Sequence, residues 1–468
     1  MNCIELFIEQ SKNRPKEVAI YIPFQEEISF EELLRNATKA QIFYQSLKIH
    51  PGDSVLLFDS LSSRLYSSII ALAASGITII LVEPWMPIAQ IQSTIRLIKP
   101  KIFVSNSIGF IWGARVPAVR DIPQWIASSS IRSKSIDAAL KLENVHPDTP
   151  AILTFTSGTS GTPKGVIRSH GYLLKQHEIF AKHFESNKFR GPDLCLFANF
   201  VLSNLASGRG SVIISPTWKP KILKSLDHLP TKNQPTTLTT GPAFLIQLMK
   251  YSQLPTLQLI HMGGALTDCW IFEKGFEHWP KARWSHVYGG SEVEPVALAD
   301  GYEAVQKSRK QGYFQTLYLG KNVSDILPSM NEKGLWVSGP HVCPEYFGNP
   351  VENSLLKRKD AEGILWHCMG DHIAEDPTGN WWYQGRAAQN INHFILEQKI
   401  YQRLQSSKSF IHSNWLIGEG VTSQSRELLE EFSELEGVIE AEIFRDRRHR
   451  ARIDRTKTIE NGALWLNG

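Results

Sequence analysis

Residues 153–166 read LTFTSGTSGTPKGV, the densest run of Ser, Thr and Gly in this 468-residue chain. Such a run is either a flexible linker or a loop that binds phosphate. A linker fits poorly, because apolar residues 151–153 lead into the run and a Pro-Lys-Gly turn ends it. Alternating Gly and small hydroxyl residues allow several backbone N–H groups to converge on one anion. Lys164 adds a positive charge, and Thr156 could reach a metal ion bound to the phosphate. The pattern therefore favours an anion-binding loop.

Two common phosphate motifs do not account for this loop. The P-loop reads GxxxxGK followed by Ser or Thr, but counting from Gly158 the sixth residue is Pro163, and Gly165 follows the lysine. The dinucleotide motif GxGxxG also fails, because Gly158, Gly161 and Gly165 have the wrong spacing. The sequence thus predicts a phosphate site on a fold of another kind.

The bulk composition is that of a globular protein with two or three domains. Apolar residues make up 42% and charged residues 21% of the chain, which is ordinary. The net charge is +4 with Lys and Arg spread along the chain, so no nucleic-acid partner is predicted. The one local basic run, residues 445–452, has no interleaved aromatic residues on which bases could stack. We interpret it as a solvated edge near a phosphate site.

The cysteines and the hydropathy of the chain indicate the cellular compartment in which the protein is expected. The five cysteines are scattered and never form CxxC, so a reducing, cytoplasmic location is expected, without a disulfide framework or a zinc site. Glu5 and Glu9 stand where a signal peptide would be basic and then apolar. The most apolar stretch, residues 69–82, is shorter than a bilayer span and is interrupted by Ser75 and Gly76. No integral membrane segment is expected.

Helical and strand patterns alternate along the chain. The predicted helices are 31–47 and 69–74; the predicted strands are 54–58, 77–82 and 102–104, with further β-rich runs at 194–202, 211–215, 236–240 and 257–262. This alternation predicts an α/β fold, with a large N-terminal body (residues 1–385) of mainly parallel sheets flanked by helices. Residues 386–468 are expected to form a small α+β C-terminal domain with a charged helix at 425–436.

The loop at residues 154–166 closely resembles the signature loop of the adenylate-forming superfamily. This superfamily contains acyl-CoA synthetases, adenylation domains of peptide synthetases and luciferases, and its loop holds the β- and γ-phosphates of ATP. The residues that the resemblance assigns to ATP binding here are Thr156, Ser157, Gly158, Thr159, Ser160, Gly161 and Lys164.

A second motif, YGGSE at residues 288–292, resembles the family's YGxTE with Ser in place of Thr. The resemblance implies that Tyr288 stacks on adenine. It also implies that Glu292, together with Thr156, binds Mg²⁺, which prefers oxygen ligands and shares them with substrate phosphates. The remaining nucleotide-binding residues of this motif are Gly289 and Ser291.

Three shorter motifs complete the resemblance. Gly263, Gly264 and Ala265 resemble the small-residue segment that lines adenine and the acyl site, where glycine permits close backbone approach. Gly370-Asp371 resembles a family pair whose carboxylate, here Asp371, binds both ribose hydroxyls. Gly385-Arg386 resembles the hinge pair, which implies that Arg386 reaches the nucleotide and that residues 386–468 form a mobile lid.

The terminal motif departs from the family. Arg452 stands where the family has a catalytic Lys that bridges the substrate carboxylate and the α-phosphate. Arginine keeps the positive charge, but its guanidinium group is planar and broader than the compact ammonium group of lysine. Either Arg452 supports adenylation, or the first half-reaction is lost and the protein only binds ATP. The hinge departs too, since Ala388 replaces a usually acidic residue and Asn392 a common Lys. Because of these changes, the sequence does not decide whether the lid reaches its second pose, in which the acyl group is transferred to a thiol.

The stretch where relatives place part of the acyl pocket contains Phe200, Val201, Leu202, Asn204 and Leu205. No Asp is present there to pair with an α-ammonium group, which favours a fatty acid over an amino acid, although the same residues could form core. The predicted function is ATP-dependent activation of a small-molecule carboxylic acid, specifically a fatty acid, to an acyl adenylate with release of pyrophosphate. The predicted acceptor is a thiol, either CoA or the phosphopantetheine of an acyl carrier protein.

Two alternatives stay open. Residues 448–453, RHRARI, resemble the ending of the β-lactone synthetases of long-chain olefin biosynthesis. Those enzymes activate a β-hydroxy fatty acid and let its own hydroxyl attack the acyl adenylate, so no thiol acceptor is needed.

His170 follows the loop where the family often has His, and either a catalytic or a packing role fits it.

Overall fold

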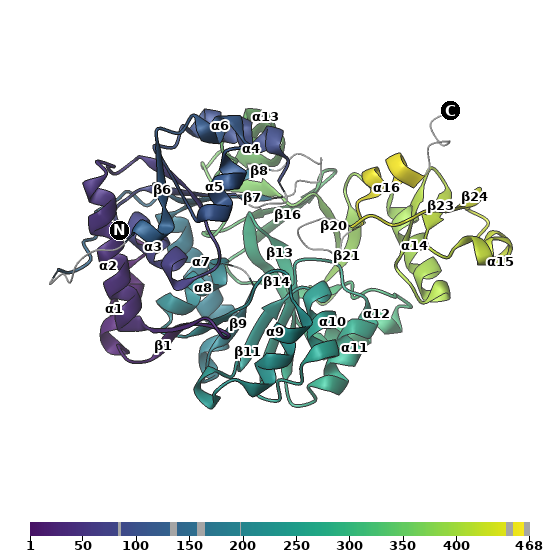
Figure 1. Cartoon of the computed structure of the whole chain (residues 1–468). Helices are drawn as coiled ribbons and strands as arrows, with labels where there is room; N and C mark the ends of the chain where they lie inside the picture. The colour runs from purple at the N-terminus through teal and green to yellow at the C-terminus, as the bar shows by residue number, and fades with distance from the viewer. Residues whose placement is uncertain (83–85, 132–137, 157–163, 197, 446–452, 463–468) are drawn as a thin grey trace.

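The computed structural model describes residues 1–82, 86–131, 138–156, 164–196, 198–445 and 453–462. The molecule consists of a large body and a smaller C-terminal lobe at one side of it (Figure 1). Strands of the described residues form sheets of eleven, six, four and three strands. Helices flank the two large sheets, as the alternating sequence pattern predicts.

The six-stranded sheet carries the strands on either side of residues 157–163. Its strands, in sheet order, are β6 (Gln124–Ala127), β5 (Ile102–Ser105), β3 (Ser54–Phe58), β4 (Thr78–Leu81), β7 (Pro150–Thr156) and β8 (Lys164–Ser169). All neighbours are parallel except β7 and β8, which are antiparallel. Thr156 and Lys164 are direct partners in that pair. Both ends of the predicted phosphate loop are therefore anchored in one sheet.

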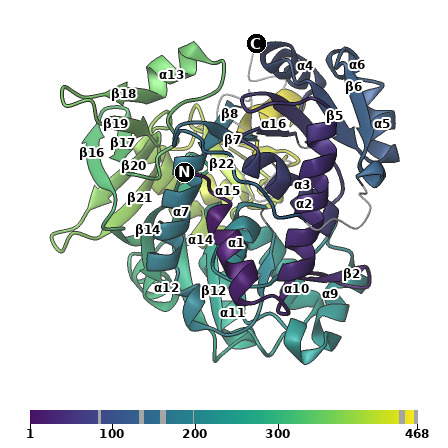
Figure 2. The ribbon, with the colours of Figure 1, turned by 90° about the vertical axis from the view of Figure 1, so that its left-hand side faces the viewer.

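Helices cover both faces of this sheet, because its buried strands alternate apolar side chains between two cores. Val55 and Ile79 pack on one side and Leu56 and Ile80 on the other. The helices of the first side are α1 (Glu5–Asn13), α2 (Phe30–Ser46) and α3 (Ser63–Ala74); those of the second are α4 (Ile88–Ile98), α5 (Ser107–Gly113) and α6 (Pro117–Arg120). Figure 2 looks onto α1 and α2, which lie side by side.

The eleven-stranded sheet runs through the rest of the body. Its strands, in sheet order, are β2 (Glu26–Ser29), β1 (Val18–Ile22), β10 (Ser211–Ile213), β9 (Asp193–Cys195), β11 (Thr237–Thr240), β12 (Leu259–Gly263), β13 (Arg283–Gly290), β14 (Val293–Asp300), β15 (Tyr318–Asn322), β21 (Trp381–Arg386) and β20 (Asp371–Glu375). The strands from β1 to β13 are parallel, whereas β13 to β20 are antiparallel. The carboxyl ends of parallel strands are the usual place for a ligand crevice.

Further helices and a small sheet complete the body. The helices are α7 (His170–His183), α8 (Ala198–Ala206), α9 (Pro220–Ser225), α10 (Pro242–Tyr251), α11 (Cys269–His278), α12 (Gly301–Lys310) and α13 (Pro350–Leu356). The four-stranded sheet contains β16 (Leu327–Asn331), β17 (Gly334–Ser338), β19 (Leu365–Cys368) and β18 (Lys357–Lys359).

The C-terminal lobe is built on a three-stranded sheet. Its elements are α14 (Ile391–Leu404), β22 (Ser409–His412), β23 (Trp415–Gly418), α15 (Ser425–Glu431), β24 (Gly437–Glu440) and α16 (Arg455–Gly462). A reciprocal contact joins the lobe to the body. The Gln398 side chain accepts the backbone N–H of Gln315 at 3.2 Å and donates to the Gln315 side chain at 2.9 Å. Amides thus bind the lobe to the body in this pose.

Most predicted elements are present, with shifted ends. The strand at 54–58 is confirmed without change, while the helix at 69–74 extends back to Ser63 and the charged helix at 425–436 ends at Glu431. The predicted β-rich run at 194–202 is wrong in its second half, since residues 198–202 belong to α8. A short apolar run has no periodicity that separates strand from buried helix. No helix among the described residues is long and apolar enough to cross a membrane.

Candidate active site

A large cavity of about 1710 Å³ opens between the body and the C-terminal lobe. It adjoins the carboxyl ends of β11, β12 and β13, the start of β20, and α14. Pockets for one small ligand usually occupy about 300–1,000 Å³, so this cavity has room for a nucleotide and a second substrate. The predicted site residues that line it are Lys164, Gly263, Gly264, Ala265, Tyr288, Gly289, Ser291, Glu292, Asp371 and Arg386.

Three of the predicted nucleotide residues meet at Asp371, which is buried at the start of β20. The Tyr288 hydroxyl donates to Asp371 Oδ2 at 2.6 Å, and Arg386 Nη1 lies 3.0 Å from Asp371 Oδ1. Arg386 also donates to the carbonyl of Met369 at 3.0 Å. Burial, with Asp371 beside it, raises the pKa of Tyr288 well above its usual value, so its hydroxyl remains a donor. The geometry holds a carboxylate at the cavity wall, where it can accept hydroxyl donors.

The glycines at the end of β12, Gly263 and Gly264, give the cavity a backbone wall. A Cβ at Gly263 would lie 2.5 Å from the carbonyl oxygen of Val287 on the neighbouring strand, so a side chain does not fit there. Gly264 has φ +80°, a conformation that glycine adopts without strain. The predicted small-residue segment is therefore required by close strand packing, and it leaves main chain facing the cavity.

Glu292 is the candidate metal ligand of the YGGSE motif. Its Oε1 accepts a hydrogen bond of 2.8 Å from the Tyr346 hydroxyl. Burial, with Glu292 beside it, raises the pKa of Tyr346 far above its usual value, so the phenol keeps its proton and remains a donor. The described residues contain no group of three or more His, Cys, Asp or Glu side chains that could hold a metal by themselves. One carboxylate beside a triphosphate fits Mg²⁺, which takes most of its remaining ligands from phosphate and water.

Lys164 lies at the cavity wall but is already paired. Its side chain is only 6% exposed, and its ammonium is 2.7 Å from the carboxylate of Glu352 in α13. The same ammonium is 5.3 Å from the centre of the Tyr346 ring. The lysine predicted to hold pyrophosphate therefore has a carboxylate partner within the protein.

Several predicted residues fall outside the described part of the chain. They are Ser157, Gly158, Thr159, Ser160, Gly161 and Arg452, together with the side chain of Thr156. The residues that follow Arg452 do reach the site, because Ile453 and Arg455 line the cavity. Arg455 is tied to the lobe by an ion pair of 2.8 Å with the buried carboxylate of Glu397.

The predicted acyl-pocket residues divide between cavity and core. Phe200 lines the cavity. Val201 and Leu205 are instead buried in the main core, and Leu202 packs against it. Asn204 is buried and donates to Asp193 Oδ2 at 3.2 Å. For these four residues the core alternative therefore holds, and Phe200, which lines the cavity, belongs to the same core.

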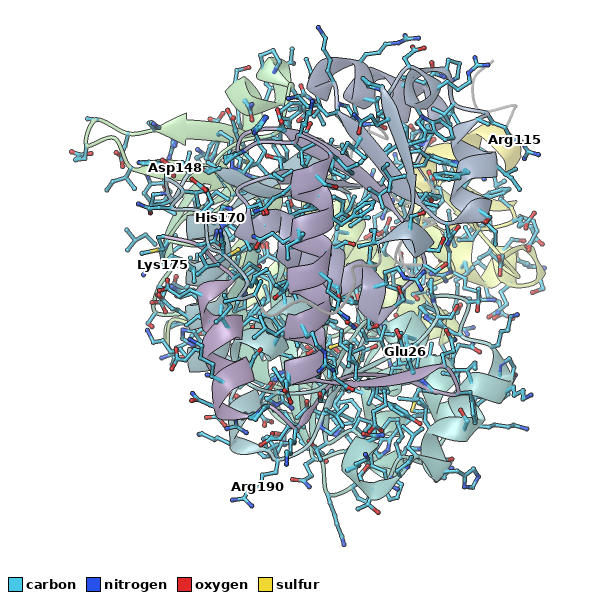
Figure 3. The ribbon with its side chains drawn as sticks, turned by 60° about the vertical axis from the view of Figure 1, so that its left-hand side comes forward. Glu26, Arg115, Asp148, His170, Lys175 and Arg190 are labelled. Carbon is cyan, nitrogen blue, oxygen red and sulfur yellow. The ribbon has the colours of Figure 1, made fainter. Side chains whose placement is uncertain are left out.

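His170 is the first residue of α7 and is labelled in Figure 3. It is fully buried, and its Nδ1 accepts the backbone N–H of Cys3 at 3.2 Å. Burial lowers its pKa from 6.5 to about 4, so the ring is neutral. These contacts favour the packing role over the catalytic one.

Sequence reasoning missed two residues of the site. Tyr346 carries the hydrogen bond to Glu292, and Arg168 lies buried on β8 with its side chain at the cavity. A charged residue inside the apolar run GVIRS was a visible signal for Arg168. No local pattern marks Tyr346, whose partner is far away in the sequence.

The sequence profile described as AMP-binding enzyme matches residues 7–347. The chain belongs to the AMP-binding enzyme family. It is 25% identical over 389 residues to a probable CoA ligase (CCL5) of Humulus lupulus, covering 75% of this chain and 68% of that one. It is 24% identical over 340 residues to an olefin beta-lactone synthetase of Xanthomonas campestris pv. campestris, covering 65% of this chain and 58% of that one.

Among solved structures, the amide bond synthetase McbA of Marinactinospora thermotolerans is similar over 97% of this chain and 98% of that one, with a TM-score of 0.78 and 15% identity. At that identity the likeness concerns the fold, which is the one that the sequence motifs imply. The family model thus makes this chain an AMP-binding enzyme, and its relatives include a probable CoA ligase.

Proposed function

We propose that this enzyme activates a fatty acid, or an acid with a similarly uncharged tail, as its acyl adenylate and then transfers the acyl group to a thiol. The observation that carries the proposal is one cavity that joins two chemically different walls. One wall contains the nucleotide residues Tyr288, Asp371 and Arg386, and the other contains Phe200 and Trp218.

The second wall indicates the nature of the acid. Between residues 200 and 247 the cavity is lined, among the described residues, by uncharged side chains only. They are Phe200, Thr217, Trp218, Thr239, Thr240, Pro242, Ala243, Ile246 and Gln247. This part of the lining offers no charged side chain of its own to the tail of an acid, whereas its aromatic and aliphatic members offer contact area to an apolar tail.

In the first half-reaction, a carboxylate oxygen of the acid attacks the α-phosphorus of ATP, the bond to the bridging oxygen breaks, and pyrophosphate leaves. The protein contributes mainly position and charge. In our proposal Asp371 and Arg386 hold the ribose, Tyr288 lies against adenine, and Glu292 holds Mg²⁺. Bound Mg²⁺ supplies charge neutralisation on the leaving pyrophosphate. Arg452 would neutralise charge on the α-phosphate, the role of the lysine that it replaces in the family motif.

In the second half-reaction, a thiolate attacks the acyl carbon and AMP leaves. The thiol belongs to CoA or to the phosphopantetheine of an acyl carrier protein. Support comes from the relatives, which include a probable CoA ligase. A reducing, cytoplasmic setting accords with this chemistry, and all five cysteines are free thiols.

The test is carboxylate-dependent exchange of labelled pyrophosphate into ATP, measured over short, medium, long and 3-hydroxy fatty acids with wild type and Arg452→Lys. We expect exchange in the wild type with at least one class of fatty acid. Exchange confined to amino acids or to acids with charged tails would contradict the proposal. Absence of exchange in the wild type, with recovery in Arg452→Lys, would mean that the protein binds ATP without adenylating.

The acceptor is tested separately by analysing the products with and without CoA or a phosphopantetheinylated carrier protein. We expect a thioester only when a thiol is present. The olefin beta-lactone synthetase relative makes an internal acceptor the second candidate. Consumption of a 3-hydroxy fatty acid with no thiol present, yielding a β-lactone, would establish that second function.

A further inference from the structure

Two cations project from one face of β8 into the active-site cavity. Lys164 and Arg168 are four residues apart on this strand, so their side chains point to the same side. Both residues are buried, with 5% and 6% of their surface exposed, and both line the cavity. Their surroundings differ in the presence of a counter-charge.

Lys164 has a carboxylate partner, whereas Arg168 has only neutral ones. The Arg168 guanidinium donates to the hydroxyl of Thr154 and, at 3.3 Å, to the carbonyl of Ser291. Its Nε is buried and has no hydrogen-bond partner. Within the described parts of the chain, no carboxylate oxygen comes within the 4.0 Å that defines an ion pair with this guanidinium. Arg168 is therefore a buried charge with a spare donor.

A buried cation without a counter-ion is costly, and an anion that joins it at the cavity removes that cost. The position of Arg168 indicates which anion. Its partner Ser291 precedes the candidate magnesium ligand Glu292, and its partner Thr154 lies on β7, two residues before Thr156 at the base of the loop. A planar guanidinium is well suited to phosphate oxygens.

We propose that Arg168 is a phosphate-binding residue of this site and takes a phosphate group of the nucleotide while Lys164 stays paired with Glu352. The identity of the nucleotide rests on the proposed function; the anion site does not. Arg168 belongs to the body, so its contact with phosphate is independent of the pose of the lobe that carries Arg452.

The experiment compares Arg168→Gln and Arg168→Lys with wild type in full-length protein. Dissociation constants for magnesium pyrophosphate and for MgATP are measured by calorimetry without any acid substrate. A hydrogen bond to a charged group corresponds to roughly a tenfold to hundredfold change in affinity. We expect Arg168→Gln to weaken both ligands by that factor and Arg168→Lys to fall between Gln and wild type.

Arg209→Gln is the matched control. Arg209 is also buried, donates to the Thr237 hydroxyl at 2.8 Å and has an unpartnered Nε, but it is not among the residues that line the cavity. We expect it to leave both dissociation constants within about twofold of wild type, which is small beside the tenfold effect at Arg168. The thermal midpoint of ligand-free Arg168→Gln should equal or exceed that of wild type, because the variant removes an unpaired buried charge.

Unchanged pyrophosphate and MgATP affinities in both Arg168 variants would overturn the inference. So would a lowered thermal midpoint with unchanged affinities, which is the signature of a purely structural arginine. Because these readouts need no acid, a wild type that binds MgATP but exchanges no pyrophosphate would refute the proposed function and leave the result on Arg168 intact.

Discussion

The ammonium of Lys164 lies 2.7 Å from the carboxylate of Glu352, and the two side chains are 6% and 19% exposed. Lys164 begins β8, directly after the predicted phosphate loop, while Glu352 stands in the first turn of α13. The loop lysine thus meets any incoming phosphate as a paired rather than a free charge. Phosphate must either leave this pair intact or displace Glu352.

Replacing Glu352 should therefore change nucleotide binding. In Glu352→Gln the ammonium loses its counter-charge, so we expect MgATP to bind severalfold more tightly and the ligand-free protein to be less stable by about 1–3 kcal/mol. Calorimetry and thermal unfolding measure the two effects. Glu362→Gln, at an exposed position, is the control. Weaker MgATP binding in Glu352→Gln would show that Glu352 assists the nucleotide rather than competing with it.

Tyr346 should act through the metal. Tyr346→Phe keeps the ring beneath Lys164 but removes the donor to Glu292 Oε1. We expect the Mg²⁺ concentration for half-maximal pyrophosphate exchange to rise about tenfold, since hydrogen bonds to charged groups contribute roughly 1.5–3 kcal/mol. The KM for the acid should not change. Tyr302→Phe, at an exposed position, is the control. An equal rise in both parameters would contradict a role confined to the metal carboxylate.

Asp371 should be needed for the nucleotide and not for the acid. Asp371→Asn keeps the shape but weakens the contacts with the Tyr288 hydroxyl and the Arg386 guanidinium. We expect the KM for ATP to rise tenfold to hundredfold, as for the loss of a charged hydrogen bond. Tyr288→Phe separates the two partners, because it removes only the phenol donor. If Asp371→Asn raised the KM for the acid alone, the assignment of Asp371 to the ribose would fail.

Buried histidines should make the fold sensitive to acid. Burial lowers the pKa of His261 from 6.5 to about 4, and its Nε2 donates to the carbonyl of Phe184 at 3.0 Å. The unfolded chain therefore takes up a proton near pH 6.5, whereas the folded chain does so only near pH 4. The contribution of neutral His261 to the free energy of unfolding is therefore complete above pH 6.5. It decreases as the pH falls towards 4, and the loss amounts to about 2–3 kcal/mol for this histidine.

The measurement is urea unfolding between pH 7 and pH 4. His261→Gln should reduce the slope of the free energy of unfolding against pH by the equivalent of about one proton. The control His50→Gln, at an exposed position, should leave this slope unchanged. Burial also lowers the pKa of His170 and His286 to about 4, so part of the slope must remain in the variant. An unchanged slope in His261→Gln would show that His261 is charged in the folded protein.

The sequence predicted the parts of the site that are local. Gly263, Tyr288, Glu292, Asp371 and Arg386 were each identified from two to five consecutive residues, and all of them line one cavity. Their roles follow from the resemblance of these short segments to family motifs, and such motifs can be recognised without the fold. The need for glycine where backbones approach closely is a property that the residues show by themselves. The β3 strand was predicted for the same reason, since its apolar run is short and bounded by a turn.

What the sequence by itself determined is therefore the family of folds, the order of the motifs and the kinds of side chain that meet a nucleotide. Only the tertiary structure decided which of the two buried cations on β8 is neutralised and which is not. Lys164 and Arg168 are both cations on one face of the same strand, and their partners, the carboxylate of Glu352 and the neutral carbonyl of Ser291, come from distant segments of the chain. The electrostatic state of a buried group depends on every segment that packs against it, and that sum exists only after folding.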